Sequence, residues 1–111
     1  MVPVLTAHAI DDPVAFVELE DVFRQAMQRA GHGENLVQVF TDEAEHSYWS
    51  DPEYPALLEA LLAWVERGEK PSTARVAQAC ERFRASVPGG CHFVDGYRPP
   101  PLSSRVTPRE R

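Results

Sequence analysis

The chain has 111 residues and a formal net charge of −6, and its residues are 43% hydrophobic and 25% charged. This balance, ordinary for a globular protein, excludes collagen-like, disulfide-dense and fully disordered chains. The length suffices for one small domain or for part of a larger one. No apolar run approaches the roughly 20 residues that a membrane-spanning helix needs, so we expect no membrane partner.

Charge is divided unevenly along the chain. Residues 1–69 hold three arginines against fourteen acids, a net charge of −11, whereas residues 70–111 hold eight basic residues against three acids, a net charge of +5. The acidic body argues against a nucleic-acid partner, because phosphate backbones are bound by clustered cations. The arginines of the second part are spaced among prolines, and we expect them to wrap the acidic body.

The two cysteines, Cys80 and Cys91, flank a Pro-Gly-Gly turn. A disulfide between them is geometrically feasible and would stabilise the fold by about 3 kcal/mol or less, because the loop is short. Two reduced thiols are the alternative, and an exported protein would favour the bridge. The start, MVPVLTAHAI, lacks the cationic segment and the long apolar stretch of a secretory signal peptide.

The first half of the sequence predicts a strand, a helix and a second strand. Residues 2–10 form a β-branched and apolar run that ends at Asp11, which indicates a mostly buried strand. Residues 36–40, LVQVF, indicate the second strand. The order predicts a parallel βαβ unit. Between the strands, apolar residues at helical spacing predict a helix with one buried face, which ends at Gly31: Phe16, Leu19, Val22, Phe23, Ala26, Met27 and Ala30.

The second half predicts two helices and an extended tail. Ser50 and Glu53 fit a capping box at the start of a helix that ends at Gly68. Ser72 or Thr73 caps a third helix. Three consecutive prolines predict an extended tail, so we divide the chain into a partial α/β domain (1–87) and a Pro/Arg-rich tail (88–111). The expected inner faces are Leu57, Leu58, Leu61, Leu62 and Val65 in the former helix, and Val76, Ala77, Cys80 and Phe83 in the latter.

Two parallel strands do not form a sheet that is stable alone. Each strand leaves an unpaired edge, and the apolar helix faces lack a central layer to cover. We therefore expect either the rest of a larger sheet or a partner chain, including a homodimer formed through the sheet edges.

Acids and a histidine follow the two predicted strands. Asp11 and Asp12 come directly after the first strand, and His46 follows the second. Functional groups gather beyond the carboxyl ends of parallel strands, and an acid followed by a histidine matches the end of the Ser…Asp…His order of the α/β-hydrolase triad. The structural alternatives are an N-cap for Asp12, with Pro13 at the first helical position, and a solvated loop position for His46.

The chain resembles the C-terminal end of secreted bacterial α/β-hydrolases of the esterase kind, including depolymerase-like and tannase- or feruloyl-esterase-like members. The residues that are similar are PVLTAHAIDDPVAF, FRQAMQRAG, LVQVFTDEAEHSYW, LLEALLAWVERGEKPS and the ending CHFVDGYRPPPLSSRVTPRER. The resemblance implies a strand-helix-strand-helix piece of an α/β-hydrolase sheet, followed by a third helix and the tail. It also implies Asp12 as the triad acid, His46 as the triad base, and a secreted or periplasmic protein.

The nucleophile of such a triad is absent from this sequence. None of its serines lies in a G-x-S-x-G elbow, and no oxyanion-hole segment is present. We therefore expect a fragment of a serine hydrolase for carboxylic esters that is inactive alone and that binds a small ester only when an N-terminal part completes it. We expect no cofactor and no metal site. The rival hypothesis is a non-catalytic α/β module that dimerises.

Overall fold

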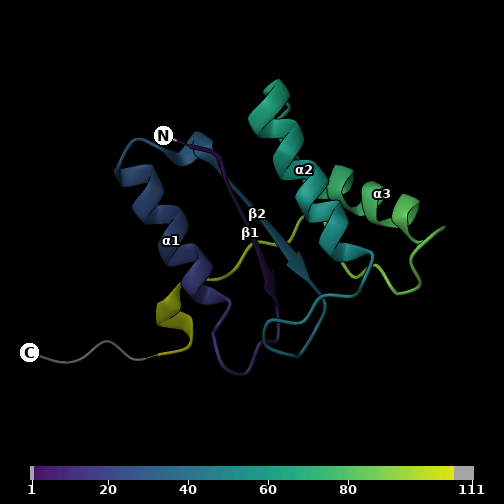
Figure 1. Cartoon of the computed structure of the whole chain (residues 1–111). Helices are drawn as coiled ribbons and strands as arrows, with labels where there is room; N and C mark the ends of the chain where they lie inside the picture. Colours follow the sequence, from purple (N-terminus) through teal and green to yellow (C-terminus); the bar gives the residue numbers. More distant parts are fainter. Residues whose placement is uncertain (1, 107–111) are drawn as a thin grey trace, which may run out of the picture.

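The computed structural model describes residues 2–106 and shows a small mixed α/β domain with one two-stranded parallel sheet. Strand β1 pairs with β2 in a register that runs from Val4 opposite Leu36 to Ala9 opposite Thr41. Helix α1 lies on one side of the sheet, and α2 and α3 lie on the other (Figure 1). The elements are β1 (Val4–Ala9), α1 (Glu18–Arg29), β2 (Leu36–Thr41), α2 (Glu53–Arg67) and α3 (Thr73–Phe83), with short 3-10 turns at Gly33–Asn35 and Leu102–Ser104. The predicted strand-helix-strand order and the two following helices are confirmed.

The hydrophobic core lies between the sheet and the helix pair α2 and α3. Val39, Val76 and Cys80 are fully buried there. Leu5, Ala7 and Val37 pack against this cluster from the same face of the sheet, because alternate strand residues point to the same side. Of the inner face predicted for the third helix, Val76, Cys80 and Phe83 are confirmed, whereas Ala79 takes the core position expected for Ala77.

Two helix boundaries follow from local chemistry. The hydroxyl of Ser72 accepts a hydrogen bond from the backbone N–H of Arg75 at 3.2 Å, which caps the start of α3. Gly68 ends α2 in the left-handed conformation with φ of 68°, where a side chain would be strained. Of the residues that the structure describes, none belongs to a helix long and apolar enough to cross a membrane.

Helix α1 turns its polar side toward the sheet, so most of its predicted buried face is wrong, although Met27 is buried as predicted. The carboxylate and carbonyl of Glu20 accept hydrogen bonds from the Gln38 amide at 2.8 and 2.7 Å, and the hydroxyl of Thr6 bonds to the same carboxylate. Because this face of the sheet presents polar side chains, the acidic side of α1 pairs with it. Three large apolar residues of α1 are left exposed: Leu19 (45%), Val22 (42%) and Phe23 (38%).

Helix α2 shows a similar departure from its predicted stripe. Its buried side consists of the small Ala56 together with Trp64. Of the predicted stripe, Leu57 packs against the core, whereas Leu58, Leu62 and Val65 are exposed on the opposite side. Apolar periodicity therefore located both helices correctly but identified only a small part of the face that each one buries.

The outward orientation of α1 gives a stability prediction. We expect Val22→Lys to change the free energy of unfolding by no more than about 0.5 kcal/mol, because its side chain already meets solvent. In contrast, Val39→Ala should cost about 2 kcal/mol, because Val39 is fully buried in the core. Urea denaturation of dilute protein measures both values. A large loss for Val22→Lys would mean that another surface covers this face in solution.

Residues after α3 return to the domain at two places. Phe93 forms an antiparallel bridge with Thr41, next to the edge of β2 that faces away from β1. Farther along, the guanidinium of Arg105 bonds to the buried carboxylate of Glu18 at 2.9 Å and lies over the Phe16 ring. A tail arginine therefore does contact the acidic body, as expected. Among residues 2–106, no strand pairs with the outer edge of β1.

Candidate active site

The loops that follow β1 and β2 lie at the same end of the sheet, since both strands point in the same direction (Figure 1). This arrangement brings together the predicted acid and histidine, which are separated by 34 residues. The Nδ1 atom of His46 lies 2.7 Å from Oδ2 of Asp12, within hydrogen-bond distance. Asp11, the second candidate acid, is exposed, and its backbone N–H donates to the carbonyl of Glu43 at 3.2 Å.

The carboxylate of Asp12 is fixed by the backbone that follows it. Its Oδ1 atom accepts hydrogen bonds from the N–H groups of Val14 and Ala15 at 2.8 and 3.0 Å, the pattern of an aspartate turn. Helix α1 begins only at Glu18, after Val17 at its N-cap, so the alternative role of Asp12 as a helix cap is wrong. One carboxylate oxygen is thus bound by the backbone, and the other faces His46.

The environment of Asp12 favours its ionised form. Burial alone would raise the pKa of its carboxyl group, but hydrogen bonds from His46, Ala15 and Val14 outweigh burial and lower the pKa below its usual value. The side chain is only 4% exposed. A buried carboxylate that stays ionised can hold an imidazole in one orientation and stabilise its protonated form.

His46 itself is accessible. Its side chain is 45% exposed, in contrast to that of Asp12. Because an ionised carboxylate can only accept, the bond to Asp12 places a proton on Nδ1, and the neutral form of the ring then has its lone pair on Nε2. None of the described residues bonds to Nε2. The Nε2 atom is therefore available to take a proton from a group that does not belong to residues 2–106.

A second histidine lies on the other side of the acid. The Nε2 atom of His8 lies 2.8 Å from the carbonyl oxygen of Ala15, to which it donates, and 3.7 Å from Oδ2 of Asp12. Its Nδ1 atom lies 3.4 Å from the carboxylate of Glu20. His8 is thus a largely buried histidine that contacts the backbone and the carboxylates on the side of Asp12 away from His46.

A small recess opens beside the Asp12–His46 pair. It encloses about 60 Å³ and is lined by both residues and by His8, Tyr48 and Trp49, among others. Ligand pockets hold roughly 300 Å³ or more, so this recess cannot enclose an ester substrate. Ser47, next to His46, has φ of 56°, a strained backbone conformation for a serine of the kind that concentrates at functional sites.

The lowered pKa of Asp12 predicts an effect of pH on stability. A carboxyl group with a lower pKa in the folded state stabilises the fold above its unfolded pKa, near 3.8, and this contribution is lost as pH falls through the folded pKa. We expect Asp12→Asn to lose less stability than the native chain between about pH 5 and pH 3. Urea midpoints at the two pH values measure the difference. Equal losses in both proteins would contradict the ionised, hydrogen-bonded state of Asp12.

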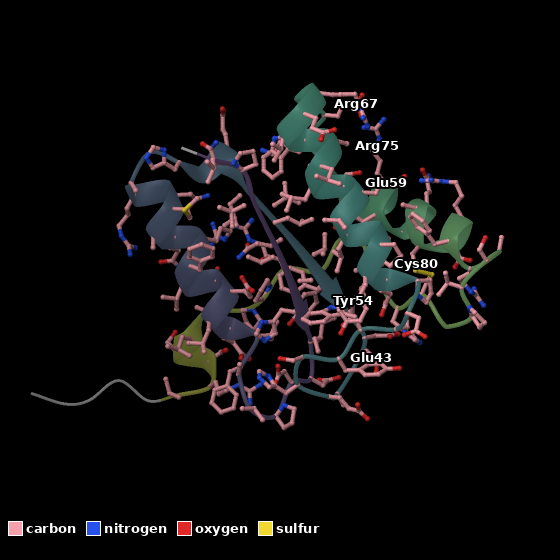
Figure 2. All side chains as sticks on the ribbon, viewed as in Figure 1. Glu43, Tyr54, Glu59, Arg67, Arg75 and Cys80 are labelled. Carbon is pink, nitrogen blue, oxygen red and sulfur yellow. A yellow bond between two sulfur atoms is a disulfide. The ribbon has the colours of Figure 1, made fainter. Side chains whose placement is uncertain are left out.

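Three residues near the site were not predicted to contribute to it. Glu53, predicted only as a capping residue, is fully buried. Its carboxylate accepts hydrogen bonds from the backbone N–H of Ser50 at 2.7 Å and from that of His92 at 2.9 Å. The ring of His92 lies 3.0 Å from the carboxylate of Glu43. Figure 2 shows Glu43 beyond the ends of the two strands. Two sequence features indicate part of this cluster: the spacing of Ser50 and Glu53, and the position of Glu43 shortly after the second strand.

Among the described residues, no group of three or more His, Cys, Asp or Glu side chains is placed to hold a metal ion. The fold and the site together define a small α/β protein with a carboxylate–imidazole pair at the carboxyl ends of two parallel strands. Comparisons with protein-family models, with curated proteins and with solved structures find no match.

Proposed function

We propose that this chain is the C-terminal portion of a serine hydrolase for carboxylic esters, with Asp12 as the triad acid and His46 as the triad base. The observation that supports this function best is the 2.7 Å contact between the two side chains, formed by a buried acid and an exposed histidine. In the reaction, Nε2 of His46 takes the proton of the attacking serine, and Asp12 stabilises the imidazolium. The imidazolium then protonates the departing alcohol.

The serine of this triad must come from outside the 111 residues. Ser50 is buried, and its hydroxyl donates to the carbonyl of Gly90. Ser47 adjoins His46 in sequence and lacks the strand-to-helix elbow that presents a nucleophile beside an oxyanion hole. The recess at the pair is also too small for a substrate, so further walls are needed. We therefore expect the chain alone to be inactive.

The DNA upstream of the codon for Met1 tests the proposal. An open frame, in phase or shifted, that encodes a G-x-S-x-G elbow supports it, whereas a stop codon followed by an unrelated gene contradicts it. A biochemical test treats the purified chain with a fluorophosphonate probe and a chromogenic acetate ester. Serine labelling, or turnover that His46→Ala abolishes, would show that the chain does contain a nucleophile.

A second candidate function is a non-catalytic module that dimerises, and the exposed apolar side of α1 favours it. The outer edge of β1 also lacks a paired strand among residues 2–106 and could pair with a second copy. Light scattering at micromolar concentration distinguishes the candidates. A dimer mass that Leu19→Lys reduces to the monomer mass would favour the module. A monomer throughout would contradict it.

A further inference from the structure

His46 lies in a loop whose tip packs little against the domain. Residues 44–48 are all exposed, and this stretch includes the histidine. An exposed loop of this kind does not hold a side chain in one place through its own packing. The position of His46 must therefore be set by its bond to Asp12 and by the two ends of the loop.

Both ends of the loop are tied to the same segment of the tail. At the first end, the N–H of Asp42 donates to the carbonyl of His92 at 3.0 Å. At the second end, the hydroxyl of Ser50 donates to the carbonyl of Gly90. Residues 90–93, here called the brace, therefore span the base of the loop that contains His46.

The brace is itself anchored to rigid elements. Phe93 bridges to Thr41 at the end of β2, and the N–H of Val94 donates to the carbonyl of Phe40 at 2.8 Å. Cys91 is joined to Cys80 of α3 by a disulfide, drawn as a yellow bond beside Cys80 in Figure 2. The brace is thus fixed to both the sheet and a core helix.

One buried side chain connects the loop, the brace and α2. Glu53 is 0% exposed, and its Oε1 atom accepts the N–H of Ser50 at 2.7 Å. Its Oε2 atom accepts the N–H of His92 at 2.9 Å. A helix-capping role uses the first bond alone, whereas the second bond reaches a residue 39 positions away. The second bond is the observation that capping does not explain.

We propose that Glu53 is a positioning residue for the triad base. By bonding to both Ser50 and His92, Glu53 fixes the second end of the loop so that Nδ1 of His46 meets Asp12. This inference rests on the proposed function and deepens it, because it identifies what orients the base. A glutamine cannot replace Glu53, because its NH₂ group can only donate and would face one of the two N–H donors.

The test compares Glu53→Gln with Glu59→Gln in the same helix. Glu59 is a control of the same residue type, because its only bonding partner among residues 2–106 is the exposed Arg82. NMR of the 111-residue chain measures three quantities: amide hydrogen exchange at Ser50 and His92, the resonance of the His46 Nδ1 proton, and the carboxyl pKa of Asp12. We expect Glu53→Gln to accelerate exchange at both amides by about tenfold or more. It should also weaken the Nδ1 proton resonance and move the Asp12 pKa toward its usual value, whereas Glu59→Gln should change none of these.

Each outcome of the test supports or overturns the proposal. If Glu53→Gln folds and exchange accelerates, but the Nδ1 proton and the Asp12 pKa are unchanged, Glu53 is a helix cap and the proposal is wrong. If Glu53→Gln does not fold, Glu53→Asp decides, because it keeps both acceptor oxygens but shortens the side chain by one methylene group. A folded Glu53→Asp with faster exchange at Ser50 and His92 and a weaker Nδ1 resonance supports the proposal, and faster exchange with an unchanged resonance overturns it.

The same spectra separate this proposal from the proposed function. Asp12→Asn should remove the Nδ1 proton resonance whatever Glu53 does. If Asp12→Asn has no effect on His46, the triad assignment fails. If Asp12→Asn removes the resonance and Glu53→Gln does not weaken it, only the role of Glu53 fails.

Discussion

Replacing Asp12 with asparagine is expected to release His46 from its present tautomer while leaving the fold intact. The carbonyl oxygen of asparagine can still accept the N–H groups of Val14 and Ala15, which bond to Oδ1 in the native chain. The amide NH₂ group would then face Nδ1 of His46, and it can only donate. His46 must therefore present a lone pair at Nδ1 and move its proton to Nε2.

The wrong tautomer removes the lone pair that a general base needs. In the 111-residue chain, long-range ¹H–¹⁵N spectra should show the proton on Nδ1 before the substitution and on Nε2 after it. In a polypeptide that also supplies the nucleophile, kcat for an ester should fall by about 10⁴-fold, the loss known for this substitution in a serine triad.

The matched control for this experiment is Asp11→Asn. Asp11 immediately precedes Asp12, and the substitution removes the same charge from an exposed position. It should leave both the His46 tautomer and kcat nearly unchanged. If Asp11→Asn has the larger effect, the acid has been assigned to the wrong residue. If neither substitution shifts the proton, the contact between Asp12 and His46 does not determine the tautomer.

The sequence allowed the acid and the histidine to be predicted because both follow strands. A parallel βαβ unit places the ends of its two strands side by side, so Asp12 and His46 meet as a consequence of topology. The end of α2 at Gly68 and the cap of α3 at Ser72 were likewise predictable, since each depends on residues close by in sequence.

The orientation of α1 was not predictable from its periodicity. An apolar stripe shows that a helix is amphipathic, but the neighbouring surface decides which side it buries. Here Thr6 and Gln38 make one face of the sheet polar, and Glu20 of α1 bonds to both. The bond from Glu53 to His92 was not predictable from the sequence either, because it joins residues 39 positions apart that meet only in the folded protein.

Removing the disulfide is expected to cause the largest loss of stability. Cys80 and Cys91 are 11 positions apart and are joined, which decides between the bridge and the two free thiols considered from the sequence. Closing a loop of about this length stabilises a fold by about 3 kcal/mol, mainly by restricting the unfolded chain. Cys80 is also fully buried in the core, so Cys80→Ala adds the loss of packed sulfur.

The experiment compares the native chain, with and without reductant, to the double variant Cys80→Ala/Cys91→Ala. A loss of about 3 kcal/mol should lower the Tm by roughly 10–20 °C in a domain of this size. Reductant should lower the Tm of the native chain and leave that of the double variant unchanged, because the sequence contains no other cysteine. A native Tm insensitive to full reduction would contradict the expected stabilisation. Since Cys91 precedes His92 in the brace, reduction should also accelerate amide exchange at His92 before the core unfolds.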